Sequence, residues 1–114
     1  GTVTDDKARI LAALENTGAA VVTDAWPREI PTRPVVLVTL AGDTGIDRRD
    51  DRYYLRELEY YVRVFAAKSS ALDAALRAVA AAMEDLGYEL CFRWEEPGDG
   101  WRQTALRYKT YVYP

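Results

Sequence analysis

Two hydrophobic periodicities divide the chain into strand and helix segments. In residues 55–66 (LRELEYYVRVFA) polar and apolar positions alternate, and the apolar set on even numbers is Leu58, Tyr60, Val62 and Val64. A period of two predicts a strand with one face in the core. In residues 69–86 the apolar positions recur at spacings of four, three, four and three, and they are Leu72, Leu76, Val79, Met83 and Leu86. That period predicts an amphipathic helix packed against the strand.

The flanking segments supply the remaining elements. Thr4 and Gly18 are the expected cap and stop of a first helix over residues 5–16. A short strand over 19–26, a proline-spaced connector over 27–34 and an apolar strand over 35–40 should follow. A hairpin should close the chain, with strands over 88–96 and 101–113 and a turn at 97–100. Its inward positions are predicted to be Tyr88, Leu90, Phe92, Trp94, Leu106, Tyr108 and Val112.

These elements predict an α+β fold with the order αβββαββ. We expect an antiparallel sheet with both helices packed on one face, forming one domain over residues 1–114. A chain of 114 residues with 49% apolar side chains is sufficient for one hydrophobic core.

A charged segment, residues 43–52 (DTGIDRRDDR), separates the second and third predicted strands. Its glycines and mixed charges predict a long loop, and long loops between paired strands are more often functional than idle. We therefore predict a subunit or partner contact loop with the charged residues Asp43, Asp47, Arg48, Arg49, Asp50, Asp51 and Arg52.

Two aromatic residues interrupt the polar face of the third strand. Tyr61 and Phe65 lie among Glu57, Glu59 and Arg63 on odd-numbered positions. They are either covered by the first helix, the interpretation we favour, or exposed as a contact surface for another subunit.

Composition excludes several classes of protein. The net charge of −3 comes from interspersed acidic and basic residues, so no basic stripe for nucleic acid is present. No apolar run reaches the roughly 18 residues of a membrane helix, which predicts a soluble protein. The single cysteine, Cys91, excludes an internal disulfide, favours a reducing cytoplasm and is expected to be a small core residue.

Candidate chemistry is sparse. The chain has no histidine, so the usual general acid or base and the usual zinc ligand are missing. The aspartates of residues 43–52 lack the alternating spacing of a calcium loop and lie among three arginines. The glycines near residue 98 belong to a hairpin turn and not to a phosphate loop. We therefore expect no enzymatic activity, no metal site and no cofactor.

The order of these elements resembles a known family. A first helix, a proline-spaced entry (Pro27, Pro31, Pro34) into residues 35–38, the charged segment, the strand YYLRELEYYVRVFA over 53–66 and an aromatic hairpin are similar to the tail-completion or tail-terminator proteins of long-tailed bacteriophages.

The resemblance implies a non-enzymatic subunit that forms a ring, usually of six, at the head-proximal end of the tail tube. Such a ring ends tube polymerisation and provides the surface that docks to the head. The implied partners are further copies of the chain, the tail tube protein and head-connector proteins, with no membrane and no sequence-specific nucleic acid. The implied location is the virion, assembled in the bacterial cytoplasm, and residues 43–52 correspond to the family's extended contact loop.

Two alternatives remain open. A phage neck or head-completion subunit would have a related role at another position in the virion. A small-ligand-binding ferredoxin-like α+β domain would need a cleft with converging polar groups, whereas the predicted cleft walls here are aromatic and aliphatic.

Overall fold

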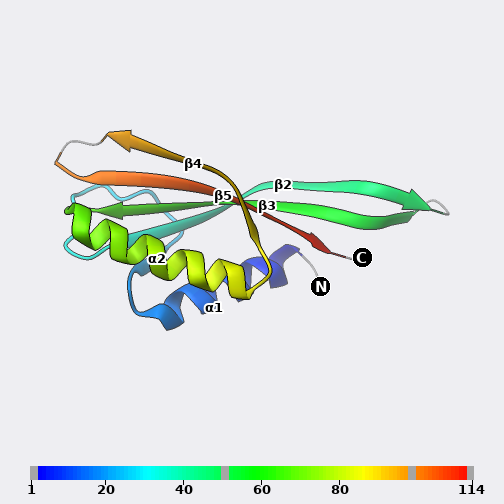
Figure 1. Ribbon diagram of the computed structural model, residues 1–114, viewed down its shortest axis with the longest axis horizontal. Coiled ribbons are helices and arrows are strands. Elements are labelled where there is room, and N and C mark those ends of the chain that lie inside the picture. Colours follow the sequence, from blue (N-terminus) through cyan, green and yellow to red (C-terminus); the bar gives the residue numbers. More distant parts are fainter. Residues whose placement is uncertain (1–2, 50–51, 98–99, 113–114) are drawn as a thin grey trace.

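The computed structural model describes residues 3–49, 52–97 and 100–112, and it shows a five-stranded sheet with two helices on one face (Figure 1). The elements follow the order αβββαββ, as predicted. Their bounds are α1 Val3–Thr17, β1 Val21–Thr23, β2 Val35–Arg49, β3 Arg52–Ala66, α2 Ser69–Asp85, β4 Glu89–Pro97 and β5 Arg102–Val112.

The sheet has the strand order β1-β2-β3-β5-β4 and is mixed. Strands β2 to β5 pair antiparallel, as expected. The expectation of a wholly antiparallel sheet is wrong at β1, which pairs parallel to β2 from Val21↔Val35 to Thr23↔Leu37. The connector over residues 24–34 explains this, because it brings the chain back to the end of the sheet where β1 began, so β2 starts in the same direction.

The core lies between the helices and the even-numbered face of β3, as the two periodicities predicted. Tyr60, Val62 and Val64 are fully buried there. From the helices, Ile10 and Leu14 of α1 join the α2 stripe in one apolar cluster, and Leu106 and Tyr108 of β5 complete it. Four of the five stripe residues of α2 are buried, and Leu86 packs against the cluster from its edge.

Glycine ends both helices, as predicted for α1. Gly18 and Gly87 have φ of 65° and 87°, the left-handed region that a side chain would strain. Helix α2 has no side-chain cap at its start. Lys68 occupies the N-cap position without a side-chain hydrogen bond, and Ser69 is already helical.

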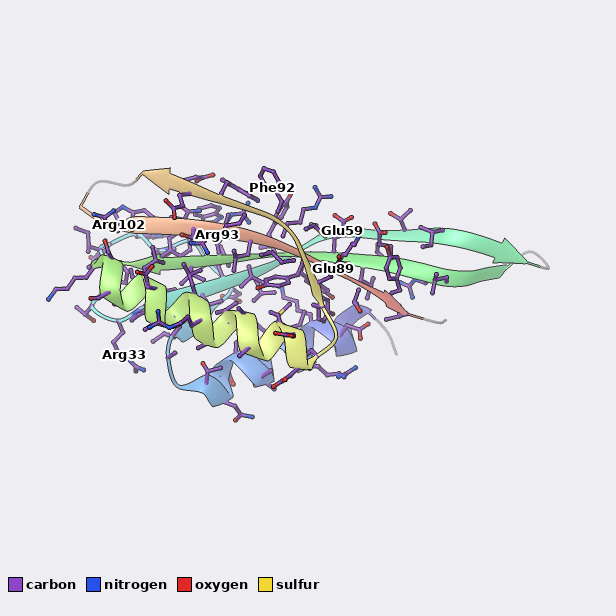
Figure 2. The ribbon with its side chains drawn as sticks, in the orientation of Figure 1. Arg33, Glu59, Glu89, Phe92, Arg93 and Arg102 are labelled. Carbon is purple, nitrogen blue, oxygen red and sulfur yellow. The ribbon has the colours of Figure 1, made fainter. Side chains whose placement is uncertain are left out.

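One extra residue in β4 reverses the predicted orientation of the hairpin aromatics. Leu90 pairs with Tyr108 and Phe92 with Arg107, so Cys91 is inserted without a partner as a β-bulge. Phe92 and Trp94 therefore lie on the face opposite the helices, and Phe92 is 59% exposed (Figure 2). Cys91 is exposed and is not the core residue that the sequence predicted.

The body is elongated because the β2–β3 hairpin continues beyond the helix layer. Its principal extents are 53 × 26 × 21 Å, and Figure 1 shows the two strands projecting past the ends of both helices. We call this projection, residues 43–49 and 52–57, the arm.

Candidate assembly surface

The arm replaces the loop that the sequence predicted. Residues 43–49 belong to β2, Arg52 opens β3, and the register runs to Arg49↔Arg52. The prediction of a long loop over 43–52 is therefore wrong. Gly42 and Gly45 are accommodated in the ladder opposite Glu59 and Arg56, and irregularities in the register precede Gly42 and follow Gly45.

An ion pair fixes the base of the arm. Arg56 Nε donates a hydrogen bond to Asp43 Oδ1 at 3.0 Å, and Arg56 Nη2 donates to the second carboxylate oxygen. The hydrogen bond to Asp43 raises the pKa of Arg56. Bidentate pairing of this kind restrains both side chains. Asp43, which we predicted as a contact residue, is therefore already paired within its own chain.

Four of the other predicted contact residues lie at the far end of the arm. The backbones of Asp47, Arg48, Arg49 and Arg52 are in paired strands, while their side chains lie outside the described part of the structure. Asp50 and Asp51 lie outside the described residues altogether. The hairpin therefore brings the ends of this charged group together by backbone pairing, and their contact role stays a prediction.

The face of β3 that carries Tyr61 and Phe65 is turned away from both helices. Our expectation that α1 covers these residues is therefore wrong. Phe65 is instead fully buried by two tryptophans from other segments. The Trp26 ring meets it edge-on with centroids 5.6 Å apart, and Trp101 stacks on it at 5.0 Å.

Tyr61 is half-buried in a mixed aromatic and arginine cluster. The Arg63 guanidinium lies 4.7 Å from the Tyr61 ring centroid and 5.1 Å from that of Trp26, and it donates to Thr39 Oγ1 at 3.3 Å. Trp94 packs edge-on against Tyr61 at 5.7 Å. Sequence reasoning placed Arg63 on this face but missed Trp26. The available signal was a tryptophan in the proline-rich connector, which must pack somewhere to be retained in a folded chain.

Glu59 and Arg107 form an ion pair beside this cluster. Burial favours the neutral form of Glu59. Hydrogen bonds with Arg107 and Glu57, together with the positive charge of Arg107, outweigh this effect and hold the pKa of Glu59 below its ordinary value. The outer face of the sheet thus combines aromatic rings with arginines, residue types that are enriched at protein interfaces.

A hollow of about 660 Å³ opens between the start of α2 and the ends of β4 and β5. Asp73, Glu95, Glu96, Arg102 and Thr104 line it together with Ala67, Leu72 and Trp101, so its walls are mixed and not only aromatic and aliphatic. The carboxylates do not converge as a reactive group. Glu96 accepts a hydrogen bond from Trp94 Nε1 at 2.9 Å, and Glu95 lies 3.6 Å from the guanidinium of Arg93.

Two further searches of the described residues gave negative results. No three acidic, cysteine or histidine side chains in residues 3–49, 52–97 and 100–112 are grouped as metal ligands. In the same ranges, neither helix combines the length and hydropathy needed to cross a membrane.

The chain shows remote likeness to solved structures. No protein-family model matches the chain. No curated protein matches it either. Among solved structures, the chain is similar to one in a structure described as "Virion of native gene transfer agent (GTA) particle", with 23% identity over 91% of this chain and 84% of that chain. The TM-score is 0.48, and we draw no functional conclusion from this likeness.

Proposed function

We propose that this chain is a non-enzymatic subunit of a long-tailed phage virion that forms a ring, of six copies, at the head-proximal end of the tail tube. The ring ends tube polymerisation and presents the surface that docks to the head. The proposal rests on the resemblance of the element order to tail-terminator proteins, together with one structural observation, the arm.

The arm supports an assembly role because β5 pairs with β3 only from Arg56 onward, so that beyond this residue β2 and β3 continue as a two-stranded segment past the helix layer (Figure 1). A two-stranded ribbon without helix cover buries little apolar surface of its own. A neighbouring subunit that covers the ribbon would bury this surface and stabilise it. The charged residues at its far end carry both signs, so that acidic and basic side chains of adjacent copies can pair head to tail, as a closed ring requires.

Such charge pairs are individually weak when exposed to solvent. Each contributes about 0–1 kcal/mol and is screened by salt. Ring formation therefore depends on many copies engaging together on a tube, and the tube acts as the template.

The test is termination of tube growth in vitro by the purified chain. Tail tube protein is polymerised with the wild type or with the triple variant Arg48→Glu, Arg49→Glu and Arg52→Glu, and tube ends are imaged by electron microscopy. We expect the wild type to form terminal rings and stop growth, and the triple variant to do neither while its melting temperature stays nearly unchanged.

The control carries the same change in charge away from the arm. Arg28, Lys68 and Arg77 are exposed on the connector and around α2, and their joint replacement by glutamate should leave ring formation intact. If the arm variant caps tubes to the same extent as this control, the arm is not the contact surface. The interface must then be sought on the face that carries Tyr61 and Phe65.

A further inference from the structure

The sheet has two open edges, one at each end of its strand order. β1 covers the edge of β2 only as far as Leu37, so within the described part of the chain no strand pairs with Val38–Ile46 of β2 on the side away from β3. β4 is the last strand at the other end. Among the described residues, no backbone hydrogen bond from a turn or loop reaches either stretch. Alternate N–H and C=O groups on both edges therefore point away from the sheet.

Exposed apolar side chains gather on these two edges. The large apolar residues exposed in the described chain include Leu40 at 45% and Ile46 at 49% on β2, and Leu90 at 46% and Phe92 at 59% on β4. Strand addition would bury side chains on both partners at once, in addition to satisfying their backbone groups.

The β2 edge also carries little charge that would oppose pairing. Between Val38 and Ile46 the chain has no proline and no lysine, and its one charged residue, Asp43, is held by Arg56. The β4 edge is more polar, with Glu89, Arg93 and two further glutamates. Because the β2 edge is nearly uncharged, it places no like charge opposite the charged residues of β4.

We propose that β4 of one copy adds to the Val38–Ile46 edge of β2 in the next copy, so that the sheets of neighbouring subunits join head to tail. This inference rests on the proposed ring. A second copy is the occupant that fits, because this chain itself carries the complementary open edge at the opposite end of the same sheet. Two different edges on one subunit make a heterologous contact, which can close into a ring.

Disulfide trapping tests the pairing directly, because Cys91 lies exposed on β4 and is the single cysteine of the chain. Cysteines are introduced one at a time at Thr39, Ala41 and Thr44 on the β2 edge, and the purified proteins are oxidised. Adjacent strands place Cα atoms within disulfide range. We expect at least one of these variants to give a ladder of dimers, trimers and larger species, at least tenfold above Ala81→Cys, a control on the exposed face of α2.

Adding Cys91→Ser should abolish the ladder, because Cys91 supplies the β4 thiol of every disulfide between β2 and β4. Dimers that persist in the Cys91→Ser background would show β2 pairing with β2, and dimers in the wild type would show β4 pairing with β4. Either result, or cross-linking no greater than with Ala81→Cys at all three positions, overturns the proposal.

A second measurement separates this inference from the ring itself. Leu40→Lys with Ile46→Lys charges the open edge, and Ile30→Lys with Tyr111→Lys makes the same change at other exposed positions. We expect the edge variant alone to lose terminal rings on tail tubes. If rings form normally with the edge variant, strand addition is wrong while the ring stands, and if the wild type forms no rings but still gives the β2–β4 ladder, the ring is wrong while the strand contact stands.

Discussion

At the scale of single residues, burial on the helix side of the sheet is nearly complete. Val79 is 2% exposed in α2, and it belongs to the same cluster as Val62 and Val64 of β3. Its helix also presents Ala81 to solvent within half a turn. Val79 and Ala81 are two residues apart on the same helix. The same substitution at each position therefore separates the effect of burying the new side chain from the effect of placing it in a helix.

Replacing Val79 with aspartate should abolish folding, because the new carboxylate would be buried without a partner. The expected cost exceeds the roughly 0.5–3 kcal/mol of an ordinary substitution. Circular dichroism during heating should show no cooperative transition, whereas Ala81→Asp should melt cooperatively near the wild type. A soluble, cooperatively melting Val79→Asp variant would show that α2 is not part of the core.

Glu59 should make stability depend on pH on the acidic side. Its pKa is lower in the folded chain than in the unfolded chain. The stabilisation is therefore fully present above the ordinary pKa of glutamate and is lost as pH falls through the lowered value. Glu59→Gln should melt below the wild type at pH 7 and lose less on acidification than the wild type does. Glu84→Gln, at an exposed position, serves as the control. Parallel pH profiles for the wild type and Glu59→Gln would contradict this role of the ion pair.

At the scale of elements, the arm depends on its pairing at the base. Asp43→Ala removes the carboxylate that restrains Arg56, where the two side chains are 27% and 24% exposed. At this exposure the global effect should stay below about 1 kcal/mol. Amide hydrogen exchange in residues 43–49 should nevertheless accelerate, whereas Thr44→Ala should leave it unchanged. Equal exchange in the Asp43→Ala variant and the wild type would show that the arm is held by backbone pairing alone.

Elements with a strong period were predictable from the sequence, and irregular ones were not. The stripe of α2 and the alternation in β3 fixed the core face, and Gly18 marked the end of α1. The bulge at Cys91 was not predictable, because a one-residue insertion in β4 depends on pairing with β5.

The arm was predicted as a loop for a similar reason. Its glycines and charges favour a turn locally, and the ladder with β3 overrides that preference. The packing of Trp26 on Phe65 joins residues far apart in the chain, so no local sequence pattern predicted it. Of the candidate site, the sequence located the charged group but not its strand conformation or the pairing of Asp43.

At the scale of the whole molecule, the long axis of 53 Å places the arm away from the core, so that assembly contacts and folding contacts are largely separate. We expect the isolated chain to be a monomer or a loose oligomer, because the proposed contacts are exposed and individually weak. Sedimentation velocity over a range of concentrations measures this. A stable hexamer at micromolar concentration without tubes would contradict the proposed dependence on the tube.

The central claim is that this subunit ends tube growth, and the most direct test is the length of tail tubes made in its absence. Lysates of a strain that produces the particle but lacks this chain are imaged, and tube lengths are compared with those of a complemented strain. The account predicts abnormally long, headless tubes that return to normal length when the chain is supplied. Tubes of normal length that fail to join heads would contradict it and would indicate a neck or head-completion subunit.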